Sequence, residues 1–523
     1  MGQQNCKTYT PPPLSLQDCL VDGRIDPARY RMYSKKMYTS DYIDNEDLNH
    51  NNKKRNIDEL DIHPIKKEVF RSVKKHKHLK RNIDGSLEEV TFKDSMWYVL
   101  YVREEPRNDR LANLFRNRFR LPYKEYEKLC NQLSVDPLFQ RWTVDDCTGC
   151  PSSDIRVLLL GSLRYLGRAH TFDDIEESTF ISREVHRIFL HTFLDYGSTN
   201  LYKKYVTDAA SHVHVSDFEK IFAMAGFDGC VGSSDATHIG MLSCPVWASN
   251  NHKGHKLAVP SRNYNATVTH ARQILSTTFG HPGTWNDKTI VLYDDLIRGV
   301  HENKTLSNLE FKLYEKNNQG EIVQVVYKGA WFIVDNGYLA WSCTVPPKKH
   351  PLSYEDIRFS EWMESVRKDV ECTFGILKGR FAILRYGLRF AKISSCDKLW
   401  LTCCALHNML LFVDGLDKNW ENGVKSFYEN ENDDDEMNVV PFAINRLNRN
   451  LVGSEVEVPN VVIENNNVTN SNINFSKYTV DGKRVVSMLP LDLFQERLIH
   501  HFDIRFKRND LQWPKRTRTS RTI

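Results

Sequence analysis

The spacing of apolar residues changes near residue 228, and this change limits the folds that the chain can adopt. Between Asp109 and Leu133, apolar side chains recur every three to four residues, which predicts two short helices joined at Leu121, because Pro122 interrupts the pattern. After residue 228, short runs containing Val or Thr are separated by Gly, Pro and Ser, which predicts consecutive strands. We therefore expect an all-α part followed by an α/β part large enough for its own core.

Helix-start signals divide the all-α part further. Ser153 and Ser182 stand where each could cap a helix, and Thr171 is followed three residues later by Asp174 in a capping-box arrangement. Three short helices joined by tight turns permit a helix-turn-helix. Its third helix would present basic and histidine side chains to a DNA major groove: Arg183, His186, Arg187 and His191. Such units are equally common as plain scaffolding, because every surface helix carries polar residues on one side.

The part after residue 228 mixes strands and helices. Strands are predicted at 228–242, 263–270, 274–279, 323–327 and 330–334, and helices at 287–300, 360–380 and 397–413. The last helix contains the longest apolar run, but His407 and Asn408 interrupt it, and it is shorter than the ~20 apolar residues of a membrane span. We expect no membrane contact and interpret these two polar residues as a buried support.

Three carboxylates stand where burial makes charge costly. Asp235 lies inside the first predicted strand, Asp335 ends the apolar run 330–334, and Glu371 lies within the long helix 360–380. A buried carboxylate loses hydration unless a positive charge compensates it, and divalent cations are the usual compensation. Mg²⁺ prefers oxygen ligands, and two such ions ~3.5 to 4 Å apart suit phosphodiester chemistry. These residues are the candidate catalytic and metal-binding set, with two ions of Mg²⁺ or Mn²⁺ as expected cofactors.

The long helix also places cations beside Glu371. Arg367 lies four residues before it and Lys378 seven residues after it, so the three share one helix face. There they could meet a DNA backbone, as could Arg380 at the end of the helix. The competing interpretation is an ordinary Arg–Glu pair on a solvated helix, worth only ~0.2 to 0.5 kcal/mol.

Two further groups are weaker candidates. Lys253 and Lys256 accompany His252 and His255 in a predicted loop, where we expect phosphate contacts rather than zinc ligands. Asp287, at the start of a predicted helix, could be an auxiliary metal contact but is better explained as a helix cap.

Five short motifs follow one another in the α/β part. They are Ser234-Asp-Ala-Thr-His-Ile-Gly240, Gly280-His-Pro-Gly-Thr-Trp-Asn-Asp287, Val334-Asp-Asn-Gly-Tyr338, Val370-Glu-Cys-Thr-Phe-Gly-Ile-Leu-Lys-Gly-Arg-Phe381 and Ala405-Leu-His-Asn-Met409. Together they resemble the PIF/Harbinger-type DDE transposase family and its host-domesticated derivatives, including the Harbinger transposase-derived nucleases. The segment Phe115-Arg-Asn-Arg-Phe-Arg120 also resembles the sequence that precedes the helical domain of that family.

The resemblance implies an α/β RNase H-like catalytic domain with an N-terminal all-α, helix-turn-helix-like domain. Motif matching carries the DDE triad onto Asp235, Asp335 and Glu371, and the 35 residues between the last two agree with such transposases. The resemblance further implies cut-and-paste transposition of double-stranded DNA, a Myb/SANT-like partner protein, a homodimer on DNA and action in the nucleus. The sequence departs from the family at Val334 and Asn336, where Gly and Ser are usual, and in a longer, partly polar segment at 295–327.

Composition completes the predicted organisation. We expect a flexible basic arm (1–95), a helical domain (96–227), a catalytic domain (228–420), a disordered Asn-rich acidic linker (421–480), and a helix with a basic tail (481–523). The helix would dock on the main body or on a partner. The arm carries eight Lys or Arg between residues 64 and 81, which fits phosphate contact or nuclear import, although the net charge is only +4.

A competing function uses the same fold without chemistry. A domesticated transposase-derived protein could serve as a DNA- or protein-binding scaffold that no longer cleaves. The intact set of Asp235, Asp335 and Glu371 argues against lost catalysis, because a pure binder has no need for three costly carboxylates.

Overall fold

The computed structural model describes residues 87–144, 152–208, 212–317, 319–416 and 490–511, and short strands at 20–21, 24–25, 78–81, 471–472, 476–480 and 483–487. The chain divides into two units, Met1–Lys77 and His78–Ile523. In the first unit only the antiparallel pair β1 (Leu20–Val21) and β2 (Arg24–Ile25) is described. Most of the predicted arm, linker and basic tail therefore lies outside the described residues. No described helix is long and apolar enough to cross a membrane.

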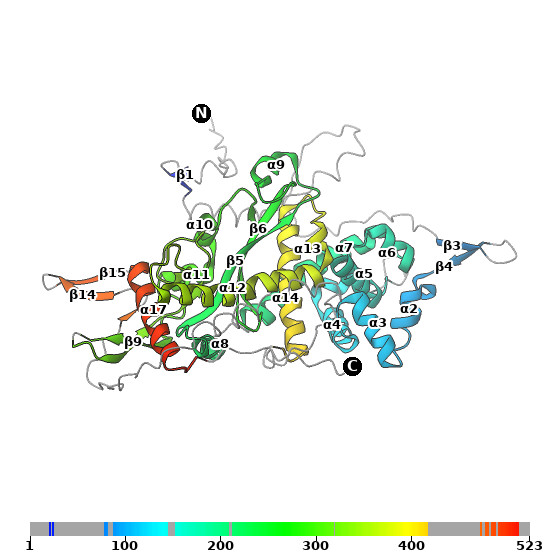
Figure 1. Ribbon diagram of the computed structural model, residues 1–523. Helices are drawn as coiled ribbons and strands as arrows, with labels where there is room; N and C mark the ends of the chain where they lie inside the picture. Colours follow the sequence, from blue (N-terminus) through cyan, green and yellow to red (C-terminus); the bar gives the residue numbers. More distant parts are fainter. Residues whose placement is uncertain are drawn as a thin grey trace, which may run out of the picture. The chain divides into compact units, whose positions relative to one another are not determined.

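The amino-terminal part of the second unit is helical after one short hairpin (Figure 1). The hairpin consists of β3 (His78–Arg81) and β4 (Leu87–Val90). The helical elements are η3 (Phe92–Asp94), α2 (Met96–Tyr101), α3 (Asp109–Phe119), α4 (Tyr123–Val135), η4 (Pro137–Trp142), α5 (Ile155–Arg168), α6 (Phe172–Thr179), α7 (Arg183–Tyr196), η5 (Gly197–Leu201), η6 (Lys203–Thr207) and α8 (His212–Met224).

Local sequence signals account for several of these helix boundaries. Thr171 and Asp174 form the predicted capping box of α6, which is confirmed. Pro122 is the residue immediately before α4, as its position in the pattern predicted. At α5 the cap is Asp154 rather than Ser153, because the Asp154 carboxylate accepts a hydrogen bond from the backbone N–H of Arg156.

The orientation predicted for His186 is wrong. Its side chain is only 2% exposed, and its Nε2 lies 2.8 Å from the Thr179 hydroxyl. Gly161 of α5 passes so close that an added Cβ would lie 2.5 Å from His186 Nδ1. Burial lowers the pKa of His186 to about 3, so the ring packs between helices as a neutral group.

The central sheet has the strand order β12-β11-β5-β6-β7, with β8 also paired to β6. Strand β6 is antiparallel to both β5 and β7, whereas β11 runs parallel to both β5 and β12. Their bounds are β5 (Cys230–Gly240), β6 (Ser261–Val268), β7 (Ile274–Thr277), β8 (His281–Pro282), β11 (Trp331–Ile333) and β12 (Thr344–Val345). Every residue of β6 and β11 is buried, so both sheet faces are covered in the middle.

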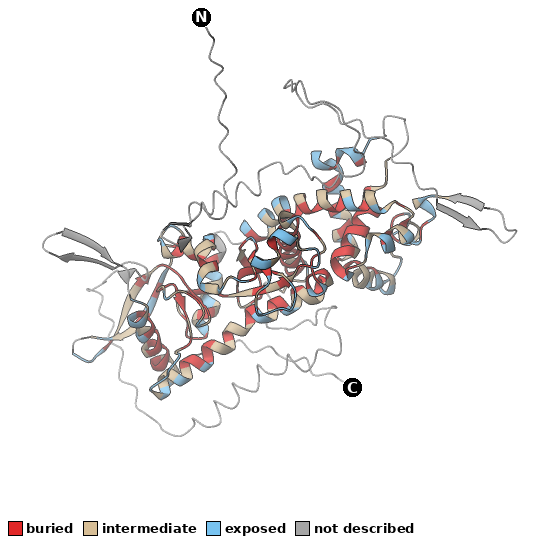
Figure 2. Cartoon of the chain, turned by 90° about the horizontal axis from the view of Figure 1, so that it is seen from above, coloured by how far each residue is buried: buried red, intermediate tan, exposed pale blue. Residues whose placement is uncertain are grey.

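Three helices follow the sheet: α12 (Tyr354–Arg380), α13 (Ala382–Tyr386) and α14 (Ile393–Val413). Buried residues form bands along the helices of this part (Figure 2). The buried support predicted within α14 is confirmed. The Asn408 amide donates to the Ile274 carbonyl at 2.8 Å and accepts from the Ile274 N–H at 2.9 Å, while His407 Nε2 lies 2.9 Å from the Arg272 carbonyl oxygen. These bonds join α14 to the residues around β7.

The segment between β8 and β11 contains both helices and a hairpin. The helical elements are α10 (Asp287–Ile290), η7 (Val291–Tyr293) and α11 (Asp295–His301). The predicted surface insertion contains α11 and the antiparallel pair β9 (Glu310–Lys316) and β10 (Ile322–Lys328), and β13 (Ser471–Asn472) adds to β10 in parallel. A separate two-stranded sheet consists of β14 (Ser476–Val480) and β15 (Lys483–Ser487).

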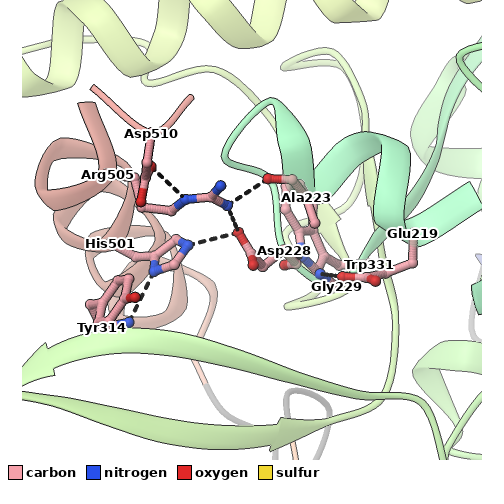
Figure 3. Close-up of polar contacts among 9 residues, drawn as sticks. All are labelled: Glu219, Ala223, Asp228, Gly229, Tyr314, Trp331, His501, Arg505 and Asp510. Atoms are coloured by element: carbon pink, nitrogen blue, oxygen red, sulfur yellow. Dashed lines mark hydrogen bonds and ion pairs between the residues drawn. The ribbon is translucent and has the colours of Figure 1, made fainter. Parts of the chain in front are cut away.

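The helix α17 (Leu491–Lys507) docks on the main body, which settles one of the two options left open by the sequence. Arg505 donates to Asp228 Oδ2 at 2.8 Å, and His501 Nε2 lies 2.7 Å from the same oxygen (Figure 3). The other ring nitrogen of His501 accepts from the Tyr314 N–H of β9 at 2.9 Å. The apolar face of α17 packs into one core cluster with residues of β11 and α12: Phe494, Leu498, Phe502, Trp331, Phe359 and Trp362.

Candidate active site

Strand pairing brings the two predicted aspartates to neighbouring strands. Ile333 of β11 is in register with Ser233 of β5, and the strands run in the same direction. Asp335 and Asp235 each lie two residues beyond this pair. Because parallel neighbours carry equivalent positions side by side, the end of β11 delivers Asp335 next to Asp235.

The third predicted carboxylate comes from α12 and reaches the first through an arginine. Arg367 Nη1 lies 3.2 Å from Asp235 Oδ2, and Arg367 Nη2 lies 3.0 Å from Glu371 Oε1. A third ion pair joins Arg367 Nε to Glu364 Oε2 at 3.1 Å. The Arg367 side chain is 15% exposed, whereas that of Glu371 is 49% exposed. The guanidinium therefore stands between a partly buried aspartate and two glutamates at the surface.

A fourth carboxylate belongs to the same site. Asn286 caps α10, with its side chain accepting from the Thr289 N–H, so the capping role predicted for Asp287 is wrong. A Cβ built on Gly337 would lie 2.9 Å from Asp335 Oδ1 and 3.1 Å from Asp287 Oδ2, which places both carboxylates against this glycine. Asp287 Oδ1 is buried and has no hydrogen-bond partner among the described residues.

The glycines of the Gly280–Asp287 motif explain how Asp287 is positioned. An added Cβ on Gly283 would lie 2.3 Å from the Ser261 hydroxyl of β6, and one on Gly280 would lie 2.6 Å from both Arg262 Nε and Asp397 Oδ1. Only glycine permits such close packing of the loop against β6. The motif thus holds the start of α10 beside the sheet.

Burial and mutual repulsion shape the electrostatics of the site. Burial raises the pKa of Asp235 to about 6, and the charges of Asp335 and Asp287 add to this effect. The Ala236 N–H, which donates to Asp235 Oδ1 at 2.7 Å, and the Arg367 guanidinium act in the opposite direction. Burial likewise raises the pKa of Asp287, against the pull of Lys256. Clustered carboxylates of this kind attract cations.

A tyrosine stands behind the carboxylates. The Tyr338 hydroxyl donates to Asn265 Oδ1, and burial together with Asp235 and Asp287 holds its pKa well above the usual range. Tyr338 therefore remains a neutral hydrogen-bond donor. A pocket of about 390 Å³ opens beside Asp335, lined also by Lys288, Tyr338 and Leu491 of α17.

The ligand chemistry suits a hard divalent cation, although the arrangement is not a formed metal site. Within the described ranges, no group of three or more His, Cys, Asp or Glu side chains converges closely enough to hold a metal ion. Asp235, Asp287 and Asp335 nevertheless supply only oxygen donors, and Asp287 Oδ1 is a buried acceptor without a donor. Mg²⁺ and Mn²⁺ prefer such donors. In the folded chain, Arg367 supplies the positive charge between Asp235 and Glu371.

The remaining predicted DNA contacts are distributed unequally. Lys378 lies beside the site and donates to the Thr237 hydroxyl at 3.0 Å. Lys253 and Lys256 are exposed after α9 (Val246–His252). Arg380 is only 1% exposed and contacts His407, so the structure does not present it to DNA, contrary to expectation.

The basic residues expected on α7 are exposed but paired. Arg183 and Arg187 form ion pairs with Asp173 and Glu184 at 3.3 and 2.7 Å. Residues 172–196 carry six carboxylates and only these two arginines. Such a charge balance does not favour approach to phosphates.

Comparison with known proteins adds one relationship. Residues 203–417 match a family model described as plant transposon protein. The matched segment contains Asp235, Asp287, Asp335 and Glu371, and it relates this part of the chain to transposases. No curated protein and no solved structure matches the chain.

Proposed function

We propose that the chain is a divalent-metal-dependent DDE transposase or transposase-derived endonuclease of the PIF/Harbinger type. The observation that carries this proposal is the β5–β11 register, which sets Asp235 and Asp335 side by side within a segment related to transposases. Glu371 lies on α12 within reach of the same arginine as Asp235. The reaction would be cleavage and joining of DNA phosphodiesters.

An RNase H-like fold is part of this proposal. Its support is the sheet, in which three antiparallel strands, β5, β6 and β7, are extended by β11 and β12 running parallel to β5. Strands β5 and β11 lie side by side in the sheet; Asp235 lies on β5, and Asp335 follows the end of β11 by two residues. The helix that bears Glu371 packs against β5 and β6.

Asp235, Asp335, Asp287 and Glu371 would hold Mg²⁺ or Mn²⁺ ions. Such ions supply activation of a water or hydroxyl nucleophile and stabilisation of the leaving oxygen. In the protein alone, Arg367 is the counter-ion of Asp235 and Glu371, and a DNA phosphate is another anion that its guanidinium can bind. Lys378 would contact the DNA backbone beside the cleaved bond. Tyr338 would keep its proton and hold Asn265 in place.

The remaining parts of the proposal follow from the resemblance to PIF/Harbinger transposases. The substrate is double-stranded DNA, held by a homodimer with the help of a Myb/SANT-like partner protein, and the protein acts in the nucleus. The basic tracts at 64–81 and 515–521 fit nuclear import and nonspecific phosphate contact.

Two glutamates on α12 provide a matched test of the catalytic assignment. Glu364 and Glu371 pair with the same guanidinium at 3.1 and 3.0 Å and are 44% and 49% exposed. We expect Glu371→Gln to abolish Mn²⁺-dependent nicking of duplex DNA and Glu364→Gln to retain it, because only Glu371 belongs to the proposed triad. Full-length proteins would be assayed on DNA carrying the element's ends, with the Myb-like partner and with EDTA as the blank.

Equal nicking by both variants would reduce Glu371 to an ion-pair partner. Metal-independent DNA binding by a wild-type protein that never nicks would support the scaffold function instead.

Asp287 yields a separate prediction about metal affinity. Asp287→Asn keeps the size of the side chain but removes a charge and an oxygen that lacks a donor. We expect Mn²⁺ to bind at least about 10- to 100-fold more weakly, because loss of even an outer-shell partner of a metal ligand typically costs that much affinity. Isothermal titration of the full chain with Mn²⁺ measures this affinity. The control variant is Asp295→Asn, because the Asp295 side chain at the start of α11 is 85% exposed. Unchanged affinity in Asp287→Asn would remove Asp287 from the site.

A further inference from the structure

Two sequence stretches of the second unit contain no acidic side chain. Residues 236–286, between Asp235 and Asp287, include no Asp or Glu, and neither do residues 372–396, between Glu371 and Asp397. The whole chain has 67 acidic residues in 523, so both stretches are strongly depleted. The first stretch is bounded at both ends by carboxylates of the candidate active site, and the second lies between Glu371 of that site and the buried Asp397.

The two stretches meet in the fold. The first contains the end of β5, helix α9 and strand β6, and the second contains α13. Beyond β5, the Leu242 N–H donates to the Leu388 carbonyl at 2.8 Å, and the Leu388 N–H donates to the Gly240 carbonyl at 2.8 Å. Figure 1 shows α9 beyond the ends of β5 and β6, with α13 nearby. The acid-free stretches therefore form one continuous region.

Basic side chains connect this region with the carboxylates. Lys253, Lys256 and Arg385 are exposed, and none forms an ion pair within the described ranges. Lys378 is half-buried and bonds to Thr237, two residues from Asp235. Burial lowers the pKa of His238 and raises that of Asp287, and the charge of Lys256 acts on both pKa values in the lowering direction, so Lys256 lies within electrostatic reach of the site. Unlike the paired arginines of α7, Lys253, Lys256 and Arg385 are available to phosphates.

Two exposed apolar side chains lie on α9, the helix that precedes Lys253 and Lys256. Trp247 is 68% exposed and Val246 is 92% exposed, both in the first turn of α9. The helix itself is firmly anchored. His252 is buried and contacts Arg262 at 3.3 Å, and the Asn251 carbonyl accepts from the Thr284 hydroxyl at 2.8 Å. The indole is thus held in solvent by a fixed helix rather than by a loose loop.

The surroundings of Trp247 favour a nucleic-acid partner over a protein partner. The centres of protein interfaces are depleted of Lys and built from contiguous apolar residues. Here the exposed apolar residues Val246, Trp247, Leu257 and Val259 are interrupted by Lys253 and Lys256, and residues 236–286 contain no acid that compensates these lysines. Exposed aromatic rings beside cationic backbone contacts are how proteins bind unstacked bases.

We propose that Trp247 is a base-stacking residue, which packs against an unpaired nucleobase of the bound DNA while Lys253 and Lys256 contact the adjacent phosphates. The inference rests on the proposed function, because it takes the DNA to be that held at the carboxylates. It adds that the DNA extends from the site along the end of β5 to α9, and that a nucleotide near the cleaved bond leaves the base stack.

Binding experiments test this proposal without requiring cleavage. The full-length protein is titrated, in EDTA, into a labelled duplex that carries one unpaired 2-aminopurine and into the same duplex fully paired. We expect Trp247→Ala to weaken binding to the first probe about tenfold and to change binding to the paired duplex little, because stacking needs an unstacked base. Trp247→Phe should retain most of the affinity. Wild type should quench 2-aminopurine fluorescence, and Trp247→Ala should not.

Controls separate stacking from charge and from self-association. Tyr354→Ala removes another aromatic side chain, 79% exposed at the start of α12, and should leave both affinities unchanged. The double variant Lys253→Gln with Lys256→Gln should weaken binding to both probes equally and reduce the salt dependence of binding.

The proposal is overturned if Trp247→Ala binds and quenches like wild type. It is equally overturned if that variant changes only the oligomeric state in light scattering, since α9 would then be a protein interface. Either result leaves the Glu371 and Glu364 comparison, and hence the catalytic proposal, intact.

Discussion

Replacing Asp335 by asparagine should abolish metal-dependent cleavage of DNA and, at the same time, stabilise the metal-free protein. The amide oxygen of the new side chain would still accept the hydrogen bond that the Gly337 N–H donates to Asp335 Oδ1 at 2.8 Å. The change removes one of the negative charges that raise the pKa of Asp235. Relief of this repulsion should increase the free energy of unfolding by roughly 1 kcal/mol, or about 1 °C in Tm for a unit as large as His78–Ile523. Thermal melts in EDTA and nicking with Mn²⁺ measure the two effects.

Asp294 is a buried aspartate with a structural role, and it serves as the control for Asp335. Asp294 accepts from the Ile297 N–H at 2.9 Å and from the Asn265 amide at 2.8 Å, so its charge is matched by donors. Asp294→Asn should therefore lower the Tm, because it weakens a buried cap, and it should retain cleavage. If Asp335→Asn instead melted several degrees below wild type and still cut DNA, Asp335 would be a structural residue and the site assignment would fail.

The largest stability effect is expected at Asp397. The Arg262 and Asp397 side chains are 5% and 1% exposed, and Arg262 donates from Nε and Nη2 to the two Asp397 oxygens at 3.1 and 2.6 Å. The Tyr264 hydroxyl donates to the same carboxylate at 2.9 Å. Asp397→Asn would leave a buried guanidinium without its counter-ion. We expect a loss of about 3 to 5 kcal/mol in the free energy of unfolding, measured by urea denaturation.

Two further variants show whether burial is the cause. The Arg298–Asp295 pair has the same chemistry at 2.9 Å, but its aspartate is 85% exposed, so Asp295→Asn should cost less than about 1 kcal/mol. The double variant Arg262→Met with Asp397→Leu should recover a large part of the loss, because it removes both buried charges together. A loss of similar size in Asp397→Asn and Asp295→Asn would contradict the desolvation argument.

The two aspartates of the sheet could be predicted because strands bury their residues in a local pattern. Asp235 lies in a run of small and β-branched residues, and Asp335 follows five apolar ones, so both positions indicate a costly buried charge. That the two strands are parallel neighbours, with Ile333 beside Ser233, depends on residues a hundred positions apart. Their convergence was implied by family resemblance and not by the local pattern.

The errors arise where a tertiary neighbour decides between two local options. Asn286 and Asp287 are both good capping residues, and only the packing of the glycine motif against β6 turns Asp287 toward Gly337. His186 and Arg380 lie on amphipathic helices whose buried faces are set by contacts with Thr179 and His407. The docking of α17 on β9 and α12 has no signal in the sequence beyond the apolar face of the helix.

The position of α17 in the core has a consequence for how the protein is made. Phe227, Phe359 and Trp362 pack against Phe502, which the ribosome adds only after residues 417–489 have been translated. At ordinary rates of synthesis the nascent chain spends roughly 4 to 15 seconds with these aromatic side chains uncovered. A chain released early in that interval lacks the helix that lines the pocket beside Asp335. Translation through α17 is therefore needed before this aromatic cluster is covered and before Leu491 completes the pocket beside Asp335.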